Sequence, residues 1–187
     1  MKNKKKLTFD QQRKLLLTPC QTKQEFKNWI YYHLGLSLPD VTVSRYSDTN
    51  PLEVIWEVYR ICVLKQNPEN IQELLYVAGR GSGKTLGMAI AELMILLHDS
   101  RDVVHVGAIQ NQAERCYAYQ KSFLYNRKLK PVVMPPDVPD EARILEKANM
   151  SKSVFNLGYD KVTIEVIPCT LKACNGPHVP QIGRAHV

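Results

Sequence analysis

The sequence lacks an apolar run of the roughly 20 residues that a membrane-spanning helix needs. Its longest apolar stretch, residues 86–97, is interrupted by Glu92 and is followed by His98 and Asp99. The lysine-rich N-terminus is not followed by the apolar segment of a signal peptide. These absences argue against a membrane protein or a secreted one, and we expect a cytoplasmic protein without a membrane partner.

Closely spaced cysteine pairs are also missing. The five cysteines are scattered without CxxC spacing, so the sequence predicts reduced thiols and indicates neither a disulfide framework nor a zinc site. They are Cys20, Cys62, Cys116, Cys169 and Cys174. No internal repeat is present, and 187 residues of which 44% are hydrophobic suffice for one domain with a real core.

Acidic residues are fewer than basic ones, 18 against 25, which gives a formal net charge of +7. This balance suits a nucleic-acid partner. Much of the charge sits at the extreme terminus, however, where a solvated tail explains it equally well; these residues are Lys2, Lys4, Lys5 and Lys6. Basic and aromatic residues interleave over residues 117–130, and we interpret that spacing as an amphipathic core helix.

The most specific motif is the stretch Ala78-Gly79-Arg80-Gly81-Ser82-Gly83-Lys84-Thr85. Its glycines allow successive backbone N–H groups to point at an anion. Lys84 adds a positive charge for the outer phosphates, and the Thr85 hydroxyl can ligate Mg²⁺. The pattern is that of a phosphate-binding loop, with Ala78 in place of the usual glycine. It predicts a site for a nucleoside triphosphate and Mg²⁺.

The loop stands in the context that this motif requires. Residues 74–77 are an apolar run typical of a buried strand, and residues 86–97 predict a helix that is apolar nearly all round. Strands over residues 103–107 and 161–168, and a helix over 108–125, follow. The alternation predicts an α/β fold of the P-loop NTPase type, with three α/β/α layers around an incomplete, mainly parallel sheet.

Three helices are expected before the loop, over residues 9–17, 22–34 and 52–64. Thr22 and Glu25 form a capping-box pattern at the start of the second, and Pro51 stands at the first turn of the third, whose apolar face should pack on the sheet. We therefore divide the chain into a helical N-terminal region with a linker, residues 1–50, and a partial P-loop ATPase domain, residues 51–180.

The loop, with an arginine inside it, resembles that of the ATPase domain of the large terminase subunit of tailed bacteriophages. The resemblance spans roughly residues 20–180 and rests on several segments. They are residues 79–85, the apolar strand and helix start of 103–117, the strand 162–170 with the following 172–178, and the amphipathic stretch 51–61.

The resemblance implies a motor that hydrolyses ATP to translocate double-stranded DNA into a viral capsid in the host cell cytoplasm. In that family Lys84 would stabilise the outer phosphates in the transition state, and Thr85 would hold Mg²⁺. Arg80 would be a second catalytic residue at the γ-phosphate, although pairing with a neighbouring carboxylate is an equal alternative. The family also implies a homo-oligomeric ring, a portal and a small terminase subunit as partners, and a separate nuclease domain.

A hydrolysing P-loop enzyme needs a carboxylate at the end of an apolar strand, and the sequence does not place one there. Asp102 and Asp160 precede strands, and Asp137 and Asp140 lie among prolines. Residues 181–187 match the translation of a common short-read sequencing adapter, and we expect them to be a non-native tail on a truncated chain. The fragment by itself is then expected to be inactive.

Other functions stay open. A helicase-like translocase would share the loop and the order of strands, and a small-molecule kinase or a nucleotide switch would share the loop alone. A non-enzymatic partner-binding module fits poorly with an intact phosphate loop. His33, His98 and His105 lie on or at the ends of apolar elements, so we expect them to be packed or capping residues and not catalytic ones.

Overall fold

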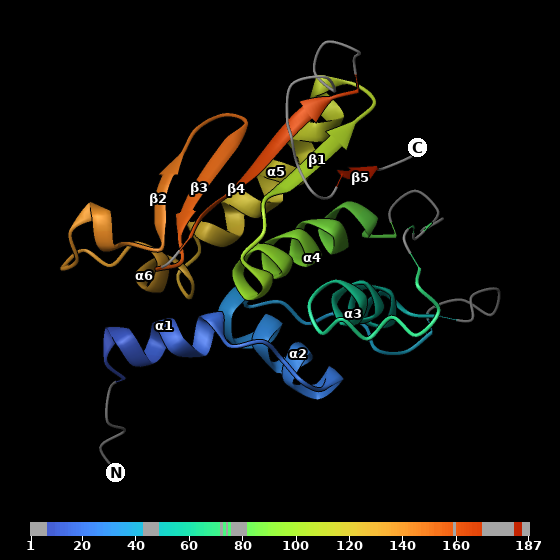
Figure 1. Cartoon of the computed structure of the whole chain (residues 1–187), viewed down its shortest axis with the longest axis horizontal. Coiled ribbons are helices and arrows are strands. Elements are labelled where there is room, and N and C mark those ends of the chain that lie inside the picture. The colour runs from blue at the N-terminus through green and yellow to red at the C-terminus, as the bar shows by residue number, and fades with distance from the viewer. Residues whose placement is uncertain are drawn as a thin grey trace.

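The computed structural model describes residues 7–42, 49–71, 73, 75, 82–158 and 160–169, together with the backbone of residues 182–184. These residues form an α/β structure in which helices stack on one mixed sheet (Figure 1). The α/β class agrees with the expectation from the sequence. None of the described helices combines the length and the apolar character needed to cross a membrane.

The N-terminal region is helical, as expected. Its elements are α1 (Phe9–Leu17), α2 (Lys23–Trp29) and the π-helical turn η1 (Ile30–Leu34), which continues α2. The capping box at α2 is confirmed, because the Thr22 side chain accepts from the Glu25 backbone N–H and the Glu25 carboxylate accepts from that of Thr22. Gly35, in the left-handed region with φ of 73°, ends the segment.

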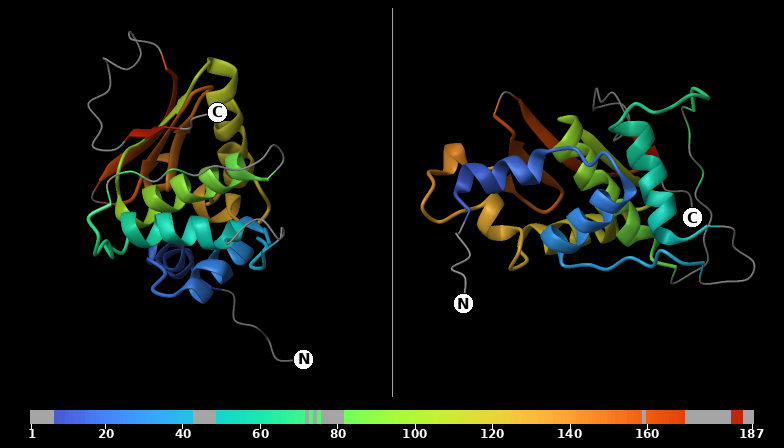
Figure 2. Two further views of the ribbon diagram at one scale, coloured as in Figure 1. Left: turned by 90° about the vertical axis from the view of Figure 1, so that its right-hand side faces the viewer. Right: turned by 90° about the horizontal axis from the view of Figure 1, so that it is seen from below.

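Helix α3 (Pro51–Cys62) starts as the sequence predicts, with Asn50 as its cap and proline in its first turn. Its expected packing on the sheet is wrong. Ile55 of α3 instead meets Gly87 of the next helix so closely that a Cβ added there would lie 3.0 Å from Ile55 Cδ1. That next helix lies between α3 and the sheet (Figure 2), so the apolar face of α3 covers a helix that has already filled the sheet surface.

Helix α4 (Lys84–Asp99) follows the phosphate-loop motif. Every residue from 89 to 97 is buried, which confirms the expectation of a helix that is apolar nearly all round. It packs on α3 on one side and on the sheet on the other. Ser100, in the left-handed conformation with φ of 51°, follows its last turn.

The predicted strand and helix after α4 are confirmed as β1 (Val103–Gly107) and α5 (Gln110–Leu124). The turn between them is tight, since a Cβ on Gly107 would lie 2.5 Å from the backbone nitrogen of Ala113. Two short elements come next, α6 (Lys130–Val133) and η2 (Asp140–Ala142). The close approach at Gly107 fixes the start of α5 against the carboxyl end of β1.

The sheet has the strand order β2-β3-β4-β1-β5. The other strands are β2 (Leu145–Ala148), β3 (Lys152–Asn156), β4 (Lys161–Pro168) and β5 (Ile182–Arg184). Strand β1 is parallel to β4 and β5, whereas β2, β3 and β4 form antiparallel pairs. The sheet is therefore mixed, which corrects the expectation of a mainly parallel one. Short turns join β2 to β3 and β3 to β4, and such turns connect only antiparallel strands.

Helices α4 and α5 cover the sheet face that carries Phe155, Val162, Ile164 and Val166, and α1 to α3 form a second helical layer behind α4 (Figure 2). The alternating burial expected for residues 161–168 is confirmed in β4. The described helices all lie on this side of the sheet, so they do not supply the third layer of the expected α/β/α arrangement.

The N-terminal helices share one hydrophobic core with the rest of the described chain. Leu16, Phe26 and Trp29 belong to the same cluster as Tyr59 and Leu96. Phe26 packs edge-on against Trp56 with ring centroids 5.5 Å apart and lies 4.9 Å from the ring of Tyr59. Residues 7–42 are therefore integral to the packing of α3 and α4.

Two sequence expectations concern regions that the structure describes only in part. Of the strand expected over residues 74–77, only Leu75 is described; it is exposed and belongs to no strand. Within the tail expected to be non-native, the backbone of β5 pairs with Val104, His105 and Val106 of β1.

Candidate functional site

The second half of the phosphate-loop motif lies at the N-terminus of α4. Ser82 and Gly83 are exposed and α4 begins at Lys84, whereas the other predicted phosphate-binding residues, Ala78, Gly79, Arg80 and Gly81, lie outside the described part of the chain. Gly83 has φ of 80°, a left-handed conformation that glycine adopts without strain. No described side chain caps α4, so its first-turn N–H groups and its dipole favour an anion there.

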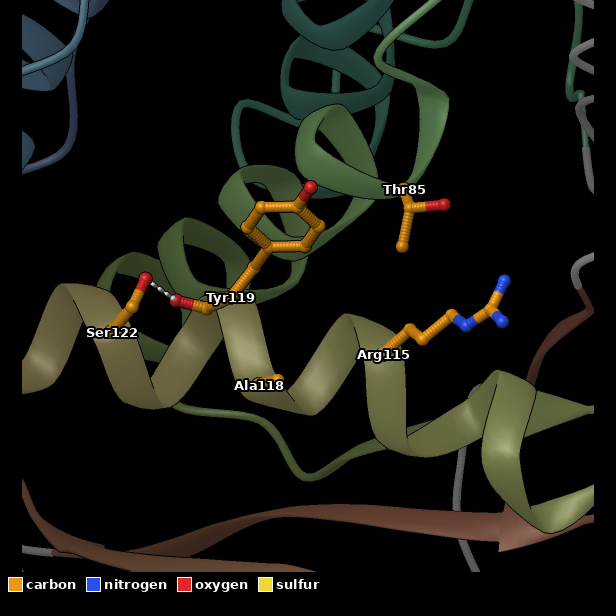
Figure 3. A pocket seen from close by; sticks show the side chains of 5 residues that line it. All are labelled: Thr85, Arg115, Ala118, Tyr119 and Ser122. Atoms are coloured by element: carbon orange, nitrogen blue, oxygen red, sulfur yellow. Dashed lines mark hydrogen bonds between the residues drawn. The ribbon is translucent and has the colours of Figure 1, made fainter. Parts of the chain in front are cut away.

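A cavity of about 550 Å³ opens beside this helix start (Figure 3). Thr85 lines it from α4, and the other lining residues come from α5: Arg115, Ala118, Tyr119 and Ser122. Figure 3 shows the Tyr119 ring reaching from α5 toward α4, with the Arg115 guanidinium on the same side as Thr85. The Ser122 hydroxyl donates to the Tyr119 carbonyl at 2.7 Å.

The cavity combines features that suit a phosphorylated ligand. Arg115 brings positive charge to the cavity from α5, and the start of α4, where Lys84 stands, adds the positive end of its dipole. The exposed Tyr119 ring offers a flat apolar surface on the same side. Cavities of about 300–1,000 Å³ are of the size that small-molecule ligands occupy.

Directly behind the first turns of α4 lies a buried polar network centred on Glu92. Its carboxylate accepts from His105 Nδ1 at 2.7 Å, from Gln120 Nε2 at 2.5 Å and from Cys116 Sγ at 3.4 Å. All four residues are at most 4% exposed. The Gln120 Oε1 atom has no hydrogen-bond partner among the described residues, and such a buried oxygen costs about 1–3 kcal/mol.

The network shifts the titration of two of its members. Burial lowers the pKa of His105, but the hydrogen bond and the charge of Glu92 outweigh burial, so the pKa is raised overall. Burial, together with the charge of Glu92, raises the pKa of the Cys116 thiol far above its usual range. Cys116 is therefore a neutral thiol that donates to Glu92 in this arrangement.

The same thiol connects the network to the candidate site. Cys116 Sγ lies 3.8 Å from the backbone carbonyl oxygen of Thr85, the residue whose side chain lines the cavity. The cavity and the buried network are thus in contact through Cys116, which lies on the same helix as the lining residues Arg115 and Tyr119.

The described carboxylates do not supply the acidic group of a hydrolysing P-loop enzyme. Asp99 pairs with Lys65 and Arg101, and Asp102 accepts from the Thr163 backbone N–H and hydroxyl. The two long parallel strands end at residues that carry no acid, β1 at glycine and β4 at proline. Within the described residues, no strand therefore ends in a carboxylate beside Thr85.

The histidines are packed, as expected. The His98 ring donates from Nε2 to the Leu16 carbonyl at 3.0 Å and accepts at Nδ1 from the Tyr59 hydroxyl at 2.7 Å. Burial lowers the pKa of His98 to about 4. Burial also lowers that of His33, whose ring lies 4.9 Å from Trp29, to about 4. His105 serves the Glu92 network and lies away from the cavity lining.

The sequence alone does not point to Arg115, Tyr119 or the Glu92 network as parts of a site. Arg115 and Tyr119 are four residues apart on α5, as are Ala118 and Ser122, and this spacing puts them on one helix face. This four-residue spacing can be read from the sequence, but it indicates a site only when α5 is known to lie beside the start of α4. The network joins residues from three elements, which no local motif reveals.

Comparisons with protein-family models, with curated proteins and with solved structures find no match to this chain.

Proposed function

We propose that this chain binds ATP and Mg²⁺ at residues 78–85 and the start of α4, and that its α/β structure is part of a P-loop NTPase fold. The observation that carries the proposal is the position of Gly83, Lys84 and Thr85. The motif ends in a left-handed glycine followed at once by a long, buried helix, and a cavity with a second cationic side chain lies beside it.

The residues present fit the nucleotide and its metal ion. Lys84 would contact the outer phosphates and the Thr85 hydroxyl would hold Mg²⁺, which neutralises phosphate charge when bound. Arg80 and the loop backbone would add further contacts to the phosphates. Arg115 and Tyr119 would meet the part of the nucleotide that extends into the cavity, by charge and by ring stacking.

The wider role that we propose is that of a viral DNA-packaging motor resembling the large terminase subunit. The net charge of +7 supports contact with double-stranded DNA. A homo-oligomeric ring, a portal and a small terminase subunit are the partners of such a motor. Because no described strand ends in a carboxylate beside Thr85, we expect nucleotide binding by this chain without rapid or DNA-stimulated hydrolysis.

Equilibrium binding of a fluorescent ATP analogue to the full chain, with and without Mg²⁺, tests the proposal. Lys84→Ala should weaken binding about tenfold or more, because it removes a charge-assisted contact to phosphate. Arg115→Ala should weaken it by about three- to tenfold, whereas Arg127→Ala, an exposed arginine just beyond α5, should leave it unchanged. Equal affinity of the wild type and Lys84→Ala would refute a phosphate site at this loop.

A further inference from the structure

The buried network of Glu92, His105, Cys116 and Gln120 has the composition of a metal site. One carboxylate oxygen, one imidazole nitrogen and one thiol sulfur lie within 4.8 Å of one another, and all three residues are buried. Nitrogen, sulfur and oxygen are the donors that Zn²⁺ takes in proteins. Zinc sites in short motifs use closely spaced cysteines, but here the ligands come from α4, β1 and α5, so sequence spacing does not reveal them.

The distances among these atoms leave room for a shared ion. Metal–ligand bonds of about 2.0–2.3 Å place the ligand atoms of a tetrahedral ion about 3.3–3.7 Å apart. In the structure, Glu92 Oε2 lies 3.4 Å from Cys116 Sγ, and the other carboxylate oxygen, Oε1, lies 2.7 Å from His105 Nδ1. One donor atom from each of the three residues lies within 4.8 Å of the other two, so shifts of about an ångström would bring them to a shared ion.

A fourth ligand is at hand in Gln120. It is fully buried and its amide nitrogen contacts the Glu92 carboxylate, while its Oε1 atom is unpartnered in the described structure. Rotation of the amide would exchange the two atoms and point the oxygen, a possible metal ligand, at the centre of the cluster. Cys116 and Gln120 are four residues apart on α5, so both side chains project from the same helix face.

Charge balance also favours an ion at this position. A dication, the Glu92 carboxylate, the Cys116 thiolate and a neutral His105 sum to zero, which suits a site that excludes water. Binding would expel the thiol proton of Cys116 and any proton shared on His105 into solvent, because metal ligands must be deprotonated. We propose that Glu92, His105, Cys116 and Gln120 bind one structural Zn²⁺ ion between α4, β1 and α5, separate from the Mg²⁺ expected at Thr85.

The proposal does not depend on nucleotide binding, so each can fail without the other. Co²⁺ titration of the full, metal-depleted chain provides the test, since thiolate-bound Co²⁺ has a near-ultraviolet charge-transfer band that Mg²⁺-type oxygen sites lack. We expect one equivalent of Co²⁺, displaceable by Zn²⁺, with this band. Cys116→Ser should abolish the band and weaken binding about tenfold or more, and Cys62→Ser, a partly buried cysteine outside the network, should preserve both.

Measurements on the wild-type chain can test the zinc site even if a variant fails to fold. X-ray absorption of the Zn²⁺-loaded wild-type chain should show one sulfur and three lighter atoms around the metal, and His105→Gln provides a second ligand variant. A folded wild type that takes up no Co²⁺ overturns the proposal. A thiolate band that survives in folded Cys116→Ser overturns it as well, because the ion would then sit at another cysteine, as does a zinc environment without sulfur.

Discussion

At the scale of single residues, two glycines with a left-handed backbone conformation allow the stability of the fold and the binding of the nucleotide to be tested separately. Gly83, at the start of α4, has φ of 80° and Gly35, at the end of η1, has φ of 73°. Among the described residues, a Cβ on Gly83 would meet no atom within 4 Å, and the nearest atoms to one on Gly35 would belong to the Lys128 side chain, at 3.6 Å. Both alanine variants therefore carry backbone strain without a hard clash.

We expect Gly83→Ala and Gly35→Ala each to lower the free energy of unfolding by about 1–2 kcal/mol, the cost of a left-handed conformation for a residue with a Cβ. Only Gly83→Ala should also weaken binding of the ATP analogue, because Gly83 belongs to the proposed phosphate loop and Gly35 does not. Urea unfolding and analogue binding measure the two effects. A Gly83→Ala variant that binds ATP as well as Gly35→Ala does would show that the left-handed glycine is dispensable for the site.

At this scale the sequence predicts the residues whose chemistry is encoded locally. Lys84 and Thr85 lie at a helix start, as the motif requires, and Thr22 and Glu25 form the expected cap. Arg115 could not be assigned, because its importance depends on how α5 docks beside α4. A contact between side chains on two helices is set by packing, which a single sequence does not specify.

At the scale of elements, the turn from β1 to α5 leaves less room for an added Cβ than the other glycine positions of the described chain. A Cβ on Gly107 would lie 2.5 Å from the Ala113 nitrogen and 2.9 Å from its Cα, and neither backbone atom can rotate away. A Cβ on Gly87 would approach Ile55 Cδ1 at 3.0 Å, but that atom ends a flexible side chain. An added Cβ would therefore meet a rigid backbone at Gly107 and a flexible side chain at Gly87.

We expect Gly107→Ala to lose about 3 kcal/mol or more of unfolding free energy, since relief requires α5 to move away from β1. Gly87→Ala should lose about 1 kcal/mol or less, because Ile55 can adjust and alanine favours the helix. Chemical denaturation of both variants provides the comparison. If Gly107→Ala unfolds at the wild-type denaturant concentration, the close docking of α5 on β1 is not a feature of the protein.

Elements with strong periodicity or clear caps were predictable, and short polar strands were not. A long apolar run predicts helix α4, and the alternation of apolar and polar residues predicts strand β4. Strands β2 and β3 are short and contain Glu146, Lys147 and Lys152, so their residues show no apolar pattern. Strand β3 forms because β4 offers it an edge, with Lys152 paired to Glu165 across the strands, and β2 then pairs with β3. The mixed sheet follows from these tertiary pairings.

At the scale of the whole molecule, a chain of hydrogen bonds ties the N-terminal region to α3 and α4. The Cys20 backbone N–H donates to the Tyr59 hydroxyl at 2.8 Å, that hydroxyl donates to His98, and His98 donates to the Leu16 carbonyl. The arrangement needs a neutral His98, because Nδ1 must accept a hydrogen bond from the Tyr59 hydroxyl. Protonation of His98 would remove this acceptor and weaken the junction between residues 7–42 and the rest of the core.

The stability of the molecule should therefore fall in mild acid. The pKa of His98 is about 4 in the folded chain, lowered by burial from 6.5, so between these values the unfolded chain binds the extra proton. Stability from this group is then complete above about pH 6.5 and decreases by about 1.4 kcal/mol per pH unit toward pH 4.

His98→Gln retains a polar side chain without a proton to gain, and it should lose this part of the slope even if it lowers stability at neutral pH. Urea unfolding of both proteins from pH 4 to pH 8 measures the two slopes. Parallel curves for the wild type and His98→Gln would mean that His98 titrates alike in the folded and unfolded chains, and that the junction does not depend on its neutral ring.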